Sequence, residues 1–198
     1  MPTVTPVAGP PKLLLGAYDI ASVGYTAGEY FVSGAAQAYG EGRQPEAEYT
    51  TRIVALTPTD SSRFNGTVLV EWLNVSGGID APAVWFMAHR EMIREGYAYI
   101  GVSAQKVGVD GGLTLTGIDM SLKTQDPERY SPLDHPGDAY SFDMFSQVGR
   151  LARESPDEVL GRLAPEFVVA IGESQSAMFL TTYINAVDHH AQIFDGFL

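Results

Sequence analysis

The sequence predicts an α/β fold whose mostly parallel sheet carries helices on both faces, as a three-layer sandwich. From residue 67 onward, strand-like runs alternate with helix-like runs, and parallel strands need such crossover helices. Two earlier strand-like runs have no helix between them, which predicts an antiparallel hairpin at the N-terminal edge of the sheet. No internal repeat is visible, so we expect a single domain over residues 1–198.

The N-terminal half supplies the predicted edge and the first parallel strands. Residues 1–11 are rich in proline and are expected to form an extended arm. Strands are expected over 29–33, 49–56, 67–73 and 97–103, where β-branched and aromatic residues gather. A helix over 82–94 precedes Gly96, a residue typical of helix C-termini.

The C-terminal half begins with a run over 105–137 that lacks periodicity and is expected to be a long loop or lid. A helix should start at Pro136-Gly137-Asp138 and bury Phe142, Phe145, Val148 and Leu151. Ser155-Pro156-Asp157-Glu158 has the pattern of a capping box and should open a short helix to about Leu163. A strand over 167–171, a helix over 175–187 and a last strand near Asp195 complete the pattern.

Composition excludes several classes of function. The formal net charge is −12 and no cluster of Lys and Arg is visible, which disfavours binding to nucleic acid or to an anionic membrane. The absence of cysteine excludes disulfides, a Cys nucleophile and thiolate metal sites. No apolar run approaches the roughly 20 residues of a membrane span. The N-terminus lacks a signal-peptide pattern, so a cytoplasmic location is the default, with a secreted or periplasmic one left open.

The most informative motif is Gly172-Glu173-Ser174-Gln175-Ser176, which lies between an apolar strand and a helix. This is the setting of a nucleophile elbow, a sharp turn that lifts a serine above the carboxyl edge of the sheet. The turn also places the N–H of Gln175 at a helix N-terminus, where it is available to an oxyanion. The alternative is that Gly172 ends a strand and Ser174 only caps the helix.

A second candidate element is Asn74-Val75-Ser76-Gly77-Gly78, directly after the strand over 67–73. In a doubly wound sheet this loop leaves the same edge as the elbow, so Val75 or Ser76 would supply a second oxyanion donor. Asn74 and Glu173 are possible pocket residues beside them. The alternative is a plain turn between strand and helix.

The run over 105–137 also leaves the carboxyl edge, and long loops in compact domains are often functional. It is expected to form one wall or a lid over the serine, with Tyr130, Leu133 and His135 as possible pocket residues. A surface insertion without a role in the site is the alternative.

Three segments in this order resemble one family. Glu71 to Gly78, His135-Pro136-Gly137-Asp138-Ala139-Tyr140-Ser141 and Gly172 to Ala177 are similar to the "alpha/beta hydrolase domain-containing" proteins, within the α/β-hydrolase fold. The resemblance covers nearly the whole chain. It implies a serine esterase-like hydrolase with a Ser, acid, His triad in that chain order. The N–H of Gln175 and the loop near Val75 would then form its oxyanion hole.

The acid and the histidine of such a triad should follow later strands, well after the nucleophile. Asp188, His189, His190 and Asp195 do follow Ser174, but a helix over 175–187 carries the chain roughly 20 Å away from it. We therefore expect the triad acid and base to lie outside this sequence, and the fold to be truncated after the helix that follows the elbow.

Two functions remain as hypotheses. The first is a serine hydrolase that acts on a small carboxylic ester through an acyl-enzyme at Ser174. The second is a catalytically inactive fragment or binding half that lacks the acid and the histidine. A homo-oligomer or a complementing C-terminal segment is then a possible partner. No cofactor is implied because a triad needs none, and no group of side chains has the spacing of metal ligands.

Overall fold

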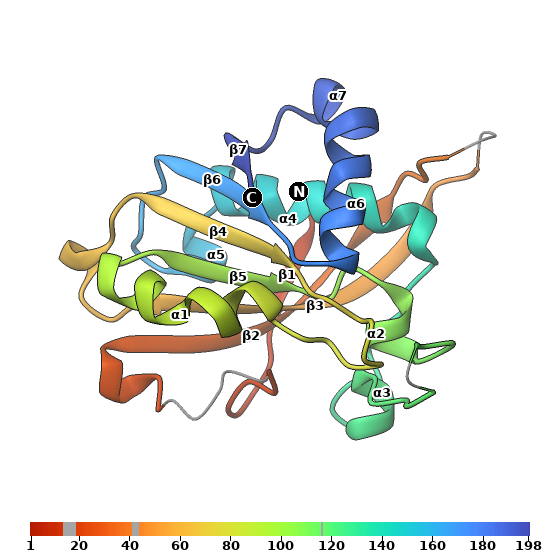
Figure 1. The fold of residues 1–198 in the computed structure, drawn as a ribbon, viewed down its shortest axis with the longest axis horizontal. Helices are drawn as coiled ribbons and strands as arrows, with labels where there is room; N and C mark the ends of the chain where they lie inside the picture. The colour runs from red at the N-terminus through yellow and green to blue at the C-terminus, as the bar shows by residue number, and fades with distance from the viewer. Residues whose placement is uncertain (14–18, 41–43, 116) are drawn as a thin grey trace.

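The computed structural model describes residues 1–13, 19–40, 44–115 and 117–198. Seven strands form one sheet in the order β1-β2-β3-β5-β4-β6-β7 (Figure 1). Their bounds are β1 Thr3–Pro6, β2 Tyr25–Ala36, β3 Ala47–Pro58, β4 Thr67–Trp72, β5 Ala98–Val102, β6 Phe167–Ile171 and β7 Gly196–Phe197. The main helices are α1 Ala83–Glu95, α2 Lys106–Asp110, α3 Leu122–Gln125, α4 Ser141–Glu154, α5 Asp157–Leu160, α6 Gln175–Tyr183 and α7 His189–Ala191.

The strand directions confirm the predicted mostly parallel sheet with an antiparallel N-terminal edge. β5, β4, β6 and β7 are parallel, whereas β1, β2 and β3 pair antiparallel with one another and β3 pairs antiparallel with β5. The hairpin of β2 and β3 is long, because its register runs from Tyr25↔Pro58 to Ala36↔Ala47. Part of the expected N-terminal arm is the edge strand β1, which pairs with β2.

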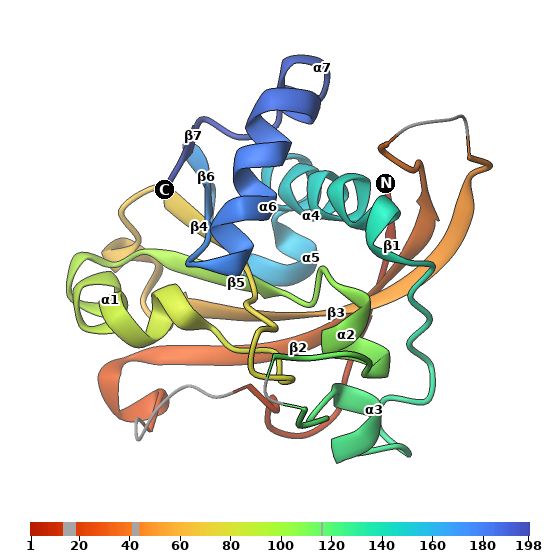
Figure 2. The same ribbon diagram turned by 45° about the vertical axis from the view of Figure 1, so that its right-hand side comes forward.

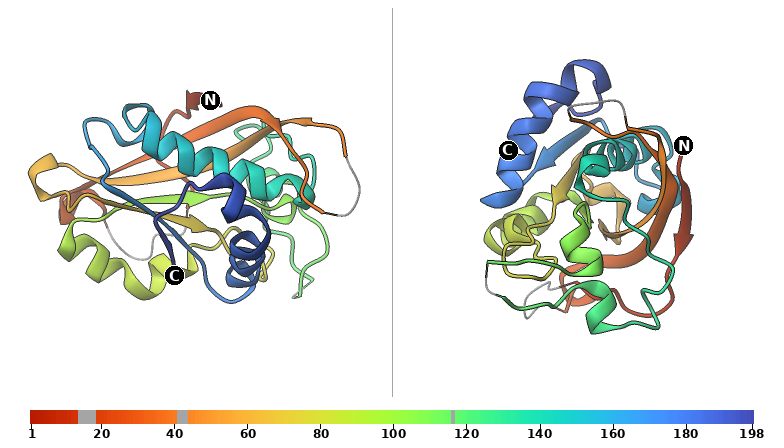
Figure 3. Two further views of the ribbon diagram at one scale, coloured as in Figure 1. Left: turned by 90° about the horizontal axis from the view of Figure 1, so that it is seen from above. Right: turned by 90° about the vertical axis from the view of Figure 1, so that its right-hand side faces the viewer.

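Helices cover both faces of the sheet, as expected for three layers. Figure 2 shows α1 on one side of the strands and α4 and α6 on the other. The alternation along β4 explains this, because successive side chains of a strand point to opposite faces. Val68, Val70 and Trp72 pack in the core with α4 and α6, whereas Leu69 packs in the core with α1. The antiparallel strands curve around α4 (Figure 3).

Glu71 is the one charged residue of β4, and its side chain points towards α1. Its carboxylate is fully buried and accepts hydrogen bonds from the N–H groups of Val84 (2.8 Å) and Trp85 (3.1 Å) and from the hydroxyl of Tyr99 (2.8 Å). The first N–H groups of a helix have no partner inside it, so Glu71 satisfies the start of α1. Burial nevertheless raises the pKa of Glu71 to about 7, and the hydrogen bonds limit the rise.

Two further expectations, both for the C-terminal half, differ from the structure. Residues 105–137 are not a plain loop, because they contain α2, α3 and a small apolar cluster with Phe31. The capping box at Ser155 does not form. The N–H of Glu158 bonds to the backbone carbonyl of Ser155, and α5 ends at Leu160. Pro156 already has helical dihedral angles, so the first turn forms through a main-chain hydrogen bond and does not need the side chain of Ser155.

Among the described residues, no helix is both long enough and apolar enough to cross a membrane.

Candidate active site

The turn between β6 and α6 is strained at Ser174. β6 ends at Ile171, α6 begins at Gln175, and Ser174 has φ 53° and ψ −114°. A positive φ is uncommon for a residue other than glycine, and such strain persists where the surroundings enforce it. The side chain of Ser174 is exposed, and within the described ranges its hydroxyl makes no hydrogen bond. Such a strained turn between a strand and a helix is typical of a nucleophile elbow, and we use the word elbow for this turn below.

The residues around Ser174 must be small because the strand and the helix approach closely. A Cβ added to Gly172 would lie 2.9 Å from Cδ1 of Leu180 and 3.2 Å from the carbonyl carbon of Ser176. Both distances are shorter than ordinary van der Waals contacts, so only glycine fits there without a shift. This crowding brings the first turn of α6 directly against the end of β6.

Ser176 is the second small residue of the motif, and its side chain stabilises the elbow. It is fully buried, its hydroxyl donates to the carbonyl of Glu173 (2.9 Å), and it accepts from the N–H of the same residue (3.0 Å). A glycine here would leave that N–H of Glu173 without this partner. The serine therefore supports the strained turn by two short-range hydrogen bonds.

Ser176→Ala is expected to lower the free energy of unfolding by about 1–3 kcal/mol, because a partly buried N–H loses its acceptor. Chemical denaturation followed by circular dichroism measures this. Ser131→Ala is the matched control: its hydroxyl also donates to the carbonyl three residues earlier (3.0 Å), but it is exposed. Equal losses in the two variants would contradict a special role of Ser176 in the elbow.

The loop after β4 lies against the elbow through Asn74. The side-chain amide of Asn74 donates to the carbonyl of Glu173 (3.0 Å), and its Oδ1 accepts from the N–H of Ser76 (2.9 Å). The main chain of Asn74 also pairs with Ala81 in both directions (2.8 and 2.9 Å). Asn74 is only 7% exposed. One buried side chain thus fixes the loop both internally and to the turn that carries Ser174.

These contacts distinguish the two candidate donors of the loop. The N–H of Ser76 is occupied by Asn74, whereas the N–H of Val75 has no hydrogen-bond partner in the described part of the chain. The N–H of Gln175, at the first position of α6, is likewise unpaired among the described residues. Unpaired N–H groups of this kind are what an oxyanion hole requires.

One cavity of about 590 Å³ joins the elbow and the loop. Its wall includes Ser174, Gln175, Val75 and Ser76. The other lining residues are Gln105, Val107, Leu113, Thr114, Leu115, Asp138, Met178 and Phe179. Residues of α2 and on both sides of it therefore form one wall, and half of the lining residues have apolar side chains. A cavity of this size suits a small ligand.

Sequence reasoning did not identify Gln105 and Asp138 as site residues. Gln105 is buried, and its Oε1 accepts from the indole of Trp72 (3.1 Å) and from the side-chain amide of Gln175 (2.9 Å). Asp138 accepts from the N–H of Lys106 (2.8 Å) and lines the cavity. Gln105 follows β5, the strand that pairs with β4, so its position at the carboxyl edge of the sheet could have identified it.

None of the five possible pocket residues, which are Asn74, Glu173, Tyr130, Leu133 and His135, is among the residues that line this cavity. Tyr130 is buried, and its hydroxyl donates to Glu29 (2.8 Å). His135 is also buried, with Nε2 donating to the carbonyl of Ala104 (2.9 Å) and Nδ1 accepting from the N–H of Gly137 (3.1 Å). Burial lowers the pKa of His135, so the ring stays neutral with both nitrogens engaged.

The other three histidines also lie outside the cavity lining. His89 is within α1, where Nδ1 is 2.9 Å from the carbonyl of Trp85. His189 and His190 are exposed in α7, which lies at the far end of the last helices from the elbow (Figure 1). Thus none of the four histidines of the chain lines the cavity beside Ser174. Within the described residues, no group of three or more His, Asp or Glu side chains is arranged to hold a metal ion.

A three-layer α/β sandwich with a strained serine between a parallel strand and a helix defines the α/β-hydrolase class. The chain belongs to the family described as "Alpha/beta hydrolase domain", whose profile matches residues 3–198. Membership of this family supports a hydrolase.

Solved structures similar to the chain are much longer than it. The rice cell wall degrading esterase LipA from Xanthomonas oryzae is 14% identical, with a TM-score of 0.46, and the match covers 98% of this chain and 47% of LipA. Oligopeptidase B from Trypanosoma brucei is 16% identical, with a TM-score of 0.45, and the match covers 92% of this chain and 21% of that enzyme. The chain thus spans less than half of either protein. No curated protein matches it.

Proposed function

We propose that this chain carries the nucleophile and the oxyanion hole of a serine hydrolase that cleaves small carboxylic esters. The observation that carries the proposal is the position of Ser174. It is exposed and strained, and it lines a cavity together with Gln175 and Val75, whose N–H groups have no hydrogen-bond partner among the described residues. Stored strain and preorganised donors are typical of acyl-transfer sites.

In the proposed reaction, Oγ of Ser174 attacks the ester carbonyl carbon while its proton passes to a base. The N–H groups of Gln175 and Val75 hold the negative charge that develops on the carbonyl oxygen. The alcohol leaves with the proton, and an acyl-enzyme remains on Ser174. Water then attacks the acyl carbon, which releases the carboxylic acid and restores the serine. The base is proposed to be a histidine other than the four of this chain.

A second candidate function is a binding half that does not catalyse the reaction by itself. The specific observation in its favour is that all four histidines lie away from the cavity, so Ser174 has no imidazole partner here. A serine hydroxyl without a base is a weak nucleophile. Under this alternative, a complementing segment or a second subunit would supply the base.

Labelling with a fluorophosphonate, which modifies activated serines, tests the proposal. We expect labelling of the protein as its own cells make it, its loss in Ser174→Ala, and hydrolysis of p-nitrophenyl acetate by the same sample. Ser131→Ala should label like the wild type, because Ser131 is an exposed serine outside the cavity.

The outcomes separate the two functions. No labelling of the protein from its own cells would overturn the hydrolase proposal. Strong labelling of the 198-residue chain alone, lost in Ser174→Ala, would instead overturn the inactive binding half. Hydrolysis of p-nitroanilides but not of p-nitrophenyl esters would retain Ser174 as the nucleophile and correct the substrate class.

A further inference from the structure

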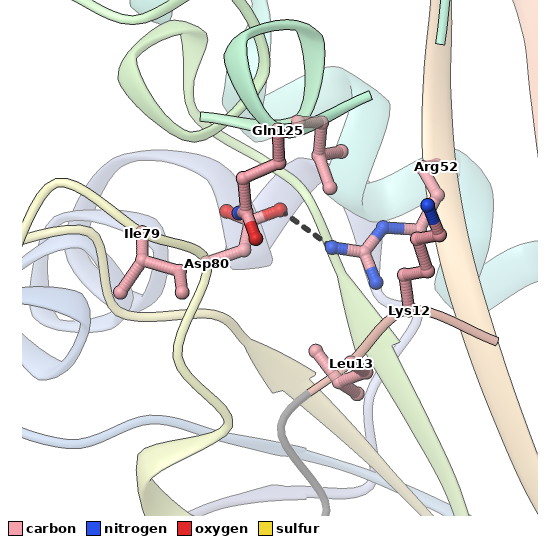
Figure 4. Close-up of a pocket in the computed structure, with 7 residues that line it drawn as sticks. Lys12, Leu13, Arg52, Ile79, Asp80 and Gln125 are labelled. Carbon is pink, nitrogen blue, oxygen red and sulfur yellow. Dashed lines mark hydrogen bonds and ion pairs between the residues drawn. The ribbon is translucent and has the colours of Figure 1, made fainter. Parts of the chain in front are cut away.

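A second cavity, of about 210 Å³, is lined in part by Ile79 and Asp80 of the loop that follows β4 (Figure 4). It is lined by Lys12, Leu13, Arg52, Ile79, Asp80, Leu122 and Gln125. None of these residues lines the cavity beside Ser174. The two cavities are therefore separate sites.

The guanidinium of Arg52 enters this cavity with two nitrogens unsatisfied. Arg52 is fully buried, and its Nη2 donates to Oδ2 of Asp80 (2.9 Å; Figure 4). Nε and Nη1 make no hydrogen bond with any described residue, although Nε lies 3.9 Å from Oε1 of Glu29. A buried donor without an acceptor destabilises the folded protein. A group in the cavity that accepts from Arg52 would remove this destabilisation.

Asp80 adds an unsatisfied acceptor to the same wall. Asp80 is only 4% exposed, and its Oδ2 accepts from Arg52 and from the hydroxyl of Ser103. Its Oδ1 is buried and has no hydrogen-bond partner among the described residues. The ion pair of Arg52 and Asp80 therefore holds unsatisfied donors and an unsatisfied acceptor, which a group that both accepts and donates can match.

The charges around this cavity are balanced. Each cation has a carboxylate partner, in the pairs Arg52 with Asp80, Arg129 with Glu29 and Lys12 with Asp126. An added anion would lie near carboxylates that are already paired, and an added cation would lie near Arg52. A buried charge without a counter-charge is costly, so this balance favours a neutral ligand.

The rest of the lining is apolar. Leu13, Ile79 and Leu122 contribute aliphatic side chains, and Leu122 is buried. Water alone would satisfy the polar atoms but gains little against aliphatic surface. A carbon skeleton that carries hydroxyl groups matches both parts of the wall.

We propose that this cavity binds a small neutral polyol. One hydroxyl accepts from Nη1 of Arg52 and another donates to Oδ1 of Asp80, while the carbon chain packs against Ile79 and Leu122. The exposed side chain of Gln125 lies at the mouth of the cavity. This binding does not depend on the chemistry proposed for Ser174.

The side-chain NMR signal of Arg52 Nε–H reports on this site directly. Titration with erythritol is expected to shift the signal saturably, whereas sodium acetate and sodium phosphate at equal ionic strength should not. Gln125→Trp, which places an indole over the mouth, should weaken erythritol binding at least about tenfold. Glu128→Trp is the matched control, because Glu128 is exposed just beyond α3 and does not line the cavity.

Three results would overturn the proposal. An Arg52 signal unchanged by erythritol would mean that the cavity holds water only. Tighter binding of acetate or phosphate than of erythritol would show that the charge argument is wrong. Equal binding by Gln125→Trp and Glu128→Trp would place the ligand elsewhere on the protein.

Discussion

Asn74→Asp is expected to slow fluorophosphonate labelling of Ser174 by at least about 100-fold, the effect of losing one oxyanion-hole donor. The substitution keeps Oδ1, which accepts from the N–H of Ser76, but it replaces the amide that donates to the carbonyl of Glu173. Two oxygens would then face each other where a 3.0 Å hydrogen bond exists. The loop should move away from the elbow and carry the N–H of Val75 with it.

Asn65→Asp is a close control for this experiment. The Oδ1 of Asn65 also accepts from the N–H two residues later, that of Thr67, at 2.9 Å, but Asn65 is exposed at the start of β4. Its labelling rate should equal that of the wild type. A rate for Asn74→Asp within threefold of the wild type, in a folded protein, would show that the loop does not depend on this contact.

Glu71→Gln is expected to change how stability depends on pH. In the folded protein the pKa of Glu71 is about 7, above the 4.5 of an unperturbed glutamate, so the folded state holds this proton more tightly. The contribution of Glu71 to stability is therefore full below about pH 4.5 and is lost as the pH rises through about 7. The total loss is about 3 kcal/mol, from a difference of about 2.5 units.

The measurement is the free energy of unfolding of both proteins in urea between pH 4.5 and 8. The value for Glu71→Gln minus that for the wild type should rise by about 3 kcal/mol over this range. Taking the difference cancels other titrating groups, including His135, whose lowered pKa acts in the opposite direction. A flat difference for Glu71→Gln would contradict the raised pKa.

Local sequence patterns predicted the strands and helices that carry strong periodicity. The strand over 167–171 matches β6, and Phe142, Phe145, Val148 and Leu151 are all buried in α4. The full length of β2 was not predicted, because Gly28, Gly34 and several alanines within it have low β-propensity. Its pairing with β3, and not its own residues, determines its length.

Features that depend on tertiary contacts could not be predicted from local sequence patterns. α2 and α3 contain five and four residues, too few to show a helical period. The choice of Val75 over Ser76 as the unpaired donor follows from the side chain of Asn74, which sequence alone could not orient. The contact between Asn74 and Glu173 joins residues 99 positions apart, and only the parallel pairing of β4 with β6 brings them together.

Glu173 joins the loop after β4 to the elbow through its main-chain carbonyl and not through its side chain. Three donors converge on its carbonyl oxygen, which are the amide of Asn74, the hydroxyl of Ser176 and the N–H of Ser176. Every residue type has this carbonyl, so the identity of residue 173 is free to vary without loss of the junction. The side chains that join the two halves of the site are instead those of Asn74 and Ser176. Grafting this elbow onto another scaffold therefore requires the transfer of these two residues as well.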